Sequence, residues 1–184
     1  MEQTQPELII TNEIAAVVAE TEPAQAAALC DEILKAKRVF VGGAGRSLLM
    51  MKAFAMRLMH IGLASYVVGE TNTPGIGPGD LLIVGTGSGS TRTTLSLVNS
   101  ATSHGARTAA LTASPEGDIP RACDLVLQLH CIPCRRLDGS GTHQPMGSLF
   151  EQCLLITCDG LVMRLAAALN ATEEQMRTRH TKLE

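Results

Sequence analysis

The sequence predicts an α/β domain built on a doubly wound, five-stranded parallel sheet with the flavodoxin-like strand order 2-1-3-4-5. Five short runs of apolar and β-branched residues alternate with helical stretches, without the alternating polarity of a sheet that has one face in water. Glycine-rich loops follow two of these runs, as is typical of strand ends that hold a ligand. The five runs are residues 38–43, 64–69, 81–85, 107–112 and 124–129.

Two helices are expected before the first strand. Residues 7–20 and 24–36 carry apolar side chains at helical spacing. Pro23 lies between them and suits the first turn of the second helix. We expect an N-terminal helical hairpin over residues 1–37.

The sheet region is expected over residues 38–130, with a Met-rich helix at 47–61 and another helix at 91–104. A glycine-rich, irregular segment follows at 130–144. A long apolar helix then runs from 148 to 169.

A last helix begins near Thr172, because Thr172 and Gln175 have the spacing of a capping box. Together with the preceding helix it forms a C-terminal helical region over residues 146–184. With 184 residues and 45% hydrophobic content, the whole chain, 1–184, is expected to form one domain around one core.

The composition argues against several classes of partner. A net charge of −3 spread along the chain gives no basic surface for nucleic acid, and 2% aromatic residues leave little for base stacking. The acidic N-terminus does not resemble a signal peptide, and no apolar run approaches the roughly 20 residues that span a bilayer. We therefore expect a cytoplasmic protein whose partners are small molecules and other copies of itself.

Six cysteines are present, and Cys131 and Cys134 form a C-x-x-C pair. A zinc site needs two further ligands, but His130 and His143 do not have a recognised zinc spacing. We expect reduced, incidental cysteines and no metal site.

The two glycine-rich loops are the strongest candidates for a binding site. Loop 42–47 (GGAGRS) follows the first strand and loop 85–91 (GTGSGST) follows the third, so they flank the point where the strand order reverses. Glycines expose backbone amides, while hydroxyls and a helix start complete a cage for phosphate oxygens. The alternative to a binding site is that these residues are purely structural: a tight turn with a helix cap, and an arginine on the surface. The candidate phosphate-binding residues are Arg46, Ser47, Thr86, Gly87, Ser88, Gly89, Ser90 and Thr91.

Nucleotide binding is disfavoured by the same loops. A nucleoside-triphosphate loop needs a lysine at the helix start, and loop 85–91 has none. A dinucleotide fold needs a third glycine after Gly43 and Gly45 at the required spacing, and it is missing. A phosphomonoester is the ligand that this pattern favours.

Glu151 and His180 are the candidate proton-transfer residues. Glu151 follows Ser148 at capping-box spacing, so a structural cap is one interpretation; a general base at a helix start is the other. His180 stands in a charged C-terminal stretch, where a solvated histidine is the default expectation.

Six segments of the chain together resemble the 6-phospho-3-hexuloisomerase branch of the sugar isomerase (SIS) domain family. They are GAGRS with KAFAMRLMHIG (52–62), VVGETNTP (67–74), GDLLIVGTGSGST (79–91), PMGSLFEQ (145–152) and RHTKLE (179–184). The resemblance covers nearly all of the chain from about residue 38.

The resemblance implies a homotetramer that interconverts 3-hexulose 6-phosphate and fructose 6-phosphate through a cis-enediol. This reaction is the second step of formaldehyde fixation by the ribulose monophosphate route, and it needs no cofactor. The resemblance also implies that the serine-rich loop from Thr86 to Thr91, together with Ser47, holds the phosphate. It makes Glu151 the proton-transfer carboxylate and His180 a residue that can reach an active site, including one in a neighbouring subunit.

Two alternatives stay open within this family. One is another aldose-ketose isomerase, acting on arabinose 5-phosphate or sedoheptulose 7-phosphate. The other is a sugar-phosphate-binding SIS module without catalysis. The chain also departs from the family pattern in two places: residues 48–51 (LLMM) are bulky, and segment 130–144 matches no known pattern.

Overall fold

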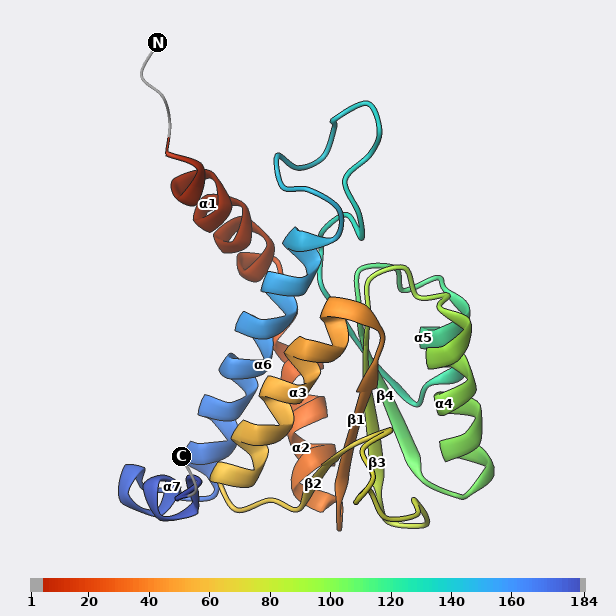
Figure 1. Cartoon of the computed structure of the whole chain (residues 1–184), viewed down its shortest axis with the longest axis vertical. Helices are drawn as coiled ribbons and strands as arrows, with labels where there is room; N and C mark the ends of the chain where they lie inside the picture. Colours follow the sequence, from red (N-terminus) through yellow and green to blue (C-terminus); the bar gives the residue numbers. More distant parts are fainter. Residues whose placement is uncertain (1–4, 183–184) are drawn as a thin grey trace.

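A five-stranded parallel sheet forms the centre of the computed structural model, which describes residues 5–182 (Figure 1). The sheet order is β2-β1-β3-β4-β5, and it confirms the predicted fold class. The last two residues of the RHTKLE motif and the first four of the predicted domain lie outside the described residues. The strands are β1 (Val39–Gly43), β2 (Ser65–Val67), β3 (Leu81–Thr86), β4 (Arg107–Thr112) and β5 (Leu125–Gln128).

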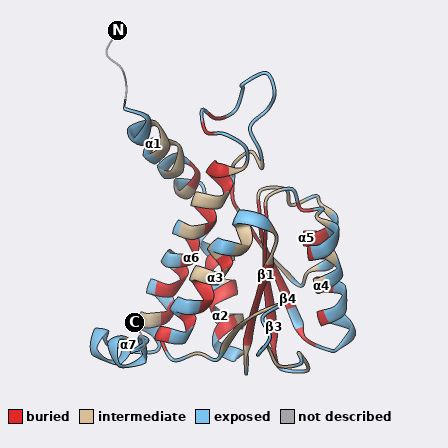
Figure 2. Cartoon of the chain, in the orientation of Figure 1, coloured by how far each residue is buried: buried red, intermediate tan, exposed pale blue. Residues whose placement is uncertain are grey.

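Helices cover both faces of the sheet. On one face α2, α3 and α6 pack around the larger core, while α4 and α5 cover the opposite face (Figure 1). Figure 2 shows the buried residues concentrated in the strands and on the sides of α2, α3 and α6 that face them. The helices are α1 (Pro6–Ala19), α2 (Pro23–Lys35), α3 (Gly45–His60), α4 (Arg92–Ser103), α5 (Asp118–Ala122), α6 (Ser148–Ala168) and α7 (Glu173–Arg179).

The central strand β3 explains why the sequence pattern lacks alternation. All six of its residues are buried, because helices cover both sides of the sheet. The crossover from β2 to β3 contains no helix, and its 13 residues, 68–80, include four glycines and two prolines. The connection from β4 to β5 carries only the short α5.

The two N-terminal helices, α1 and α2, lie one after the other along α6 (Figure 1). They do not fold back on each other, so they do not form the predicted hairpin. α1 packs against α6, and α2 packs against α6 and β5. The apolar residues that suggested a hairpin therefore pack against the rest of the domain. Pro23 does occupy the first turn of α2, as predicted.

Both predicted C-terminal helices are present, but only one has the predicted cap. The Thr172 side chain accepts a hydrogen bond from the Gln175 amide, and the Gln175 side chain accepts one from the Thr172 amide. The α6 start differs and is described below.

Within residues 5–182, no single helix combines the length and apolar character needed to cross a bilayer. Only α6 and α7 taken together meet that test, as a pair bent by 113°.

Candidate active site

The two glycine-rich loops leave the same edge of the sheet from neighbouring strands. Gly43, at the end of β1, lies opposite Gly85 in β3. A Cβ on Gly43 would lie only 3.0 Å from the Gly85 carbonyl oxygen, so the strand ends approach closely. The predicted juxtaposition of loops 42–47 and 85–91 is therefore confirmed.

Three hydroxyls gather where loop 85–91 meets α4. The Ser88 Oγ atom lies 3.5 Å from the hydroxyl oxygens of both Ser90 and Thr91. Thr91 is the N-cap of α4, but its side chain caps no amide, which leaves the first-turn N–H groups of α4 for a ligand. Ser47, in the first turn of α3, adds a half-buried hydroxyl without a partner among the described residues. Amides, hydroxyls and a helix start together suit an anion.

Thr86 and Gly89 shape this loop. The buried Thr86 hydroxyl accepts a hydrogen bond from the Gly89 amide at 3.2 Å, inside the turn. Gly89 has a φ of +66°, and a Cβ there would lie 2.7 Å from the Ser114 carbonyl oxygen. The structure thus places Thr86 within the turn, where its hydroxyl supports the loop.

The start of α6 does not contain the capping box that Ser148 and Glu151 suggested. Gly147 is the N-cap, and no side chain caps the helix. Ser148 instead occupies the first helical position, where its hydroxyl accepts a hydrogen bond from Arg46 Nη1 at 3.1 Å. The capping interpretation is therefore wrong, and the Glu151 carboxylate is free of that role.

Glu151 lies beside Arg46, which is 105 positions earlier in the sequence. Its Oε2 atom lies 3.1 Å from Arg46 Nη1, and its side chain is only 14% exposed. The two atoms are not aligned as a hydrogen bond, and buried Oε2 has no hydrogen-bond partner among the described residues. No described residue donates a hydrogen bond to either oxygen of this carboxylate, so both oxygens keep lone pairs that can accept a proton.

The first turns of α6 pack directly against loop 85–91, called the hydroxyl loop below. A Cβ on Gly87 would lie 3.1 Å from the Phe150 ring and 3.3 Å from the Pro133 carbonyl oxygen. Behind it, a Cβ on Gly85 would lie 2.7 Å from the Leu154 side chain. Glycine at these positions lets the helix that carries Glu151 approach the loop. Sequence reasoning missed both Ser148 as the partner of Arg46 and the approach of Pro133.

His180 lies away from this site in the folded chain. Its ring stacks on the buried His60 ring with centroids 5.3 Å apart, at the C-terminal end of α3. Arg46 is in the first turn of the same helix, whose 16 residues are about 24 Å long. Burial lowers the pKa of His60, and the nearby Arg57 and His180 lower it further. Within one chain, His180 and Glu151 therefore do not come together.

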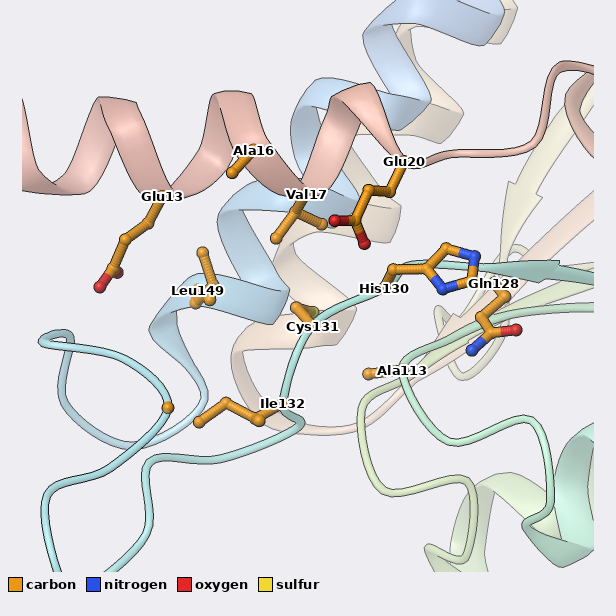
Figure 3. Close-up of a pocket in the computed structure, with 11 residues that line it drawn as sticks. Glu13, Ala16, Val17, Glu20, Ala113, Gln128, His130, Cys131, Ile132 and Leu149 are labelled. Carbon is orange, nitrogen blue, oxygen red and sulfur yellow. The ribbon is translucent and has the colours of Figure 1, made fainter.

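A separate cavity of about 530 Å³ lies on the α1 side of the α6 start (Figure 3). Glu13, Glu20, His130 and Cys131 line it, and none of the predicted site residues does. A hydrogen bond with Cys153 lowers the pKa of Cys131, an effect that burial opposes. Within the part of the chain that the structure describes, no three His, Cys, Asp or Glu side chains are placed to hold a metal ion.

Comparisons with known proteins agree with this architecture. The SIS domain model matches residues 32–133. A 3-hexulose-6-phosphate isomerase from Bacillus subtilis (strain 168) is 42% identical over 95% of each chain. A protein of the same name from Mycobacterium gastri is 39% identical over 96% of this chain and 88% of its own.

A solved structure is similar along the whole chain. It is a hypothetical protein from Methanococcus jannaschii, whose crystal structure infers a molecular function of 3-hexulose-6-phosphate isomerase. It is 33% identical, covers 98% of this chain and 100% of its own, and has a TM-score of 0.86. With its strand order, its hydroxyl loop and these similarities, the chain belongs to the SIS domain family.

Proposed function

We propose that the protein is a sugar-phosphate isomerase that interconverts 3-hexulose 6-phosphate and fructose 6-phosphate. One observation carries this proposal: the Glu151 carboxylate, paired with Arg46, stands on a helix start that packs against loop 85–91, which is rich in hydroxyl side chains. The curated relatives named 3-hexulose-6-phosphate isomerase support the choice of substrate.

The phosphate is assigned to the end of β3. The hydroxyls of Ser47, Ser88, Ser90 and Thr91 and the free amides of α4 supply its hydrogen bonds. Binding energy from this remote group holds the sugar carbons near α6, where the chemistry takes place.

Glu151 is assigned the proton transfers. From 3-hexulose 6-phosphate, its carboxylate takes the proton of C2, the released electron pair forms the C2–C3 double bond, and the C3 carbonyl oxygen gains a proton. The resulting cis-enediol loses its O2 proton, forms the C2 carbonyl and receives a proton at C3, which yields fructose 6-phosphate. No electron leaves the sugar, so the reaction is balanced without a redox partner.

Arg46 is assigned two roles by its position. It holds Glu151 by charge and Ser148 by a hydrogen bond, so it links the loop after β1 to the α6 start. Its guanidinium is half exposed, which leaves donors that can stabilise negative charge on the sugar oxygens in the transition state.

We also propose a homotetramer in which His180 serves a neighbouring subunit. His180 is remote from Glu151 in its own subunit. Exposed apolar residues on the outer sides of α3 and α6, at seven-residue spacing, support such an assembly; they are Leu49, Met56, Ile156 and Met163. The ribulose monophosphate pathway and a cytoplasmic location remain predictions from the sequence.

A coupled assay tests the proposed function. 3-Hexulose 6-phosphate is supplied and fructose 6-phosphate is detected, with arabinose 5-phosphate as the competing substrate. Turnover of the first substrate supports the proposal. Preference for arabinose 5-phosphate would indicate another isomerase of the family, and binding of fructose 6-phosphate without turnover would indicate a binding module.

A further inference from the structure

Segment 142–144 is bound to the N-terminal helix by one carboxylate. Glu13, on α1, accepts hydrogen bonds from the Thr142 hydroxyl at 2.6 Å and from the Gln144 side-chain amide at 3.0 Å. Its other oxygen accepts one from the His143 backbone amide at 2.8 Å and lies 3.0 Å from His143 Nδ1. Three consecutive residues thus converge on a side chain about 130 positions earlier in the chain.

The charge on Glu13 is well matched to these donors. Burial alone raises the pKa of Glu13, but the hydrogen bonds from Thr142, His143 and Gln144 outweigh it and lower the pKa to about 2. The carboxylate is therefore ionised at neutral pH, and hydrogen bonds to an ionised group are stronger than neutral ones.

This polar contact is the main anchor of the loop over residues 132–147. Within that range, all of which the structure describes, Thr142 and Gln144 are the only buried residues, and both bond to Glu13. Residues 134–141 are exposed, and the loop projects beyond the α6 start (Figure 1). Apolar packing therefore contributes little to its position.

The anchored segment leads directly into the site. Met146 has a φ of +53°, Gly147 caps α6, and Glu151 follows in the first turn. Arg135 braces the same region, because its backbone amide donates to the Met146 carbonyl at 2.7 Å. The Pro133 carbonyl oxygen lies against both Gly87 and Gly147, so the loop touches the hydroxyl loop and the helix start at once.

We propose that Glu13 is a positioning residue for the isomerase reaction. It clamps segment 142–144 to α1 and so holds the start of α6, with Glu151, against loop 85–91. The catalytic part of this inference rests on the proposed function. The clamp itself is a physical property of the loop and is measured without any substrate.

Glu20 provides a matched control for Glu13. Both carboxylates belong to the α1 region and line the same cavity, but in Figure 3 Glu13 points towards the loop and Glu20 towards His130. No hydrogen bond or ion pair joins the Glu20 side chain to another described residue. In Glu13→Gln an amide N–H group faces the hydrogen-bond donors of segment 142–144 in place of a carboxylate oxygen. Glu20→Gln breaks no hydrogen bond between described residues.

The first experiment compares these variants by limited trypsin digestion, which cuts the exposed loop after Arg135 or Arg136. We expect Glu13→Gln to raise the rate of this cleavage by at least about tenfold, because opening the clamp frees the loop. Glu20→Gln keeps the wild-type rate. Equal rates for the two variants would overturn the clamp.

The second experiment measures kinetics on the hexulose phosphate. We expect Glu13→Gln to lower kcat by about tenfold or more, with KM within about twofold, because Glu151 is misplaced while the phosphate loop is intact. Thr142→Val is expected to lower kcat in the same way, whereas Thr142→Ser, which keeps the hydroxyl, retains the wild-type kcat. The double variant Glu13→Gln with Thr142→Val is expected to lose less activation free energy than the sum of the two single variants.

The outcomes separate the two proposals. A released loop with unchanged kcat would refute the positioning role. A wild-type protein that binds but does not isomerise the sugar phosphate would refute the proposed function alone, since trypsin cleavage reads the clamp independently. The Thr142 pair serves the same purpose if Glu13→Gln does not fold.

Discussion

Replacing Glu151 with glutamine removes the carboxylate from the α6 start while it keeps the size of the side chain. If Glu151 transfers the proton, kcat falls by about a thousandfold, within the range that a positioned general base contributes. This loss corresponds to about 4 kcal/mol in the activation barrier. The phosphate loop belongs to β3 and α4, so binding of fructose 6-phosphate changes by no more than about threefold.

The same substitution has a small effect on stability, which separates a lost base from a damaged fold. The Arg46 side chain is 54% exposed, so its ion pair with Glu151 contributes at most about 1 kcal/mol to the free energy of unfolding. The Tm of Glu151→Gln is therefore expected to stay close to that of the wild type. Arg46 retains its hydrogen bond to Ser148 in the variant.

Solvent exchange is the direct assay. Fructose 6-phosphate is incubated with enzyme in deuterated water, and deuterium at C3 is followed by NMR. Asp159→Asn is the charge control, because Asp159 is exposed two turns further along α6. Exchange by Glu151→Gln at the wild-type rate would show that another group is the base.

Three further predictions follow from the site. Ser88→Ala combined with Thr91→Ala is expected to weaken fructose 6-phosphate binding by tenfold or more by calorimetry, since two hydroxyl donors are lost; about 1.4 kcal/mol corresponds to tenfold, and unchanged affinity would refute the phosphate assignment. Gly89→Ala is expected to lower the unfolding free energy by at least about 1 kcal/mol in urea titration, because the positive φ and the close carbonyl both oppose a Cβ; equal stability would contradict that strain. His180→Asn and Glu151→Gln homo-oligomers are each expected to be weakly active, and mixed oligomers to regain activity, because one intact site can take His180 from one chain and Glu151 from another; no gain after verified subunit exchange would argue against a shared site.

The fold was predictable because its signals are local. The apolar runs of β1, β3 and β4 have helical stretches between them, and a parallel sheet follows from that alternation. The strand order then placed loops 42–47 and 85–91 together without any knowledge of side-chain contacts. The short α5 and the crossover over 68–80 were not predicted, because neither carries a helical period long enough to detect.

The α6 start shows where local signals mislead. Ser148 and Glu151 match a capping box in sequence, but a cap needs Ser148 to precede the helix. Met146 adopts a positive φ, Gly147 takes the cap position, and Ser148 falls inside the first turn. The backbone path of the preceding loop determines where the helix begins, and a pattern of two residues three positions apart does not contain that information.

The polar contacts that define the site depend on tertiary structure for the same reason. Arg46 meets Glu151, and Glu13 meets segment 142–144, only because α3 and α1 both pack beside the α6 start. In each contact the partners are more than a hundred residues apart, so no spacing rule reports them. Segment 130–144 has no recognisable sequence pattern for this reason, because its anchor is the Glu13 carboxylate on a different helix. Substitution of Glu13 therefore also tests what this segment does.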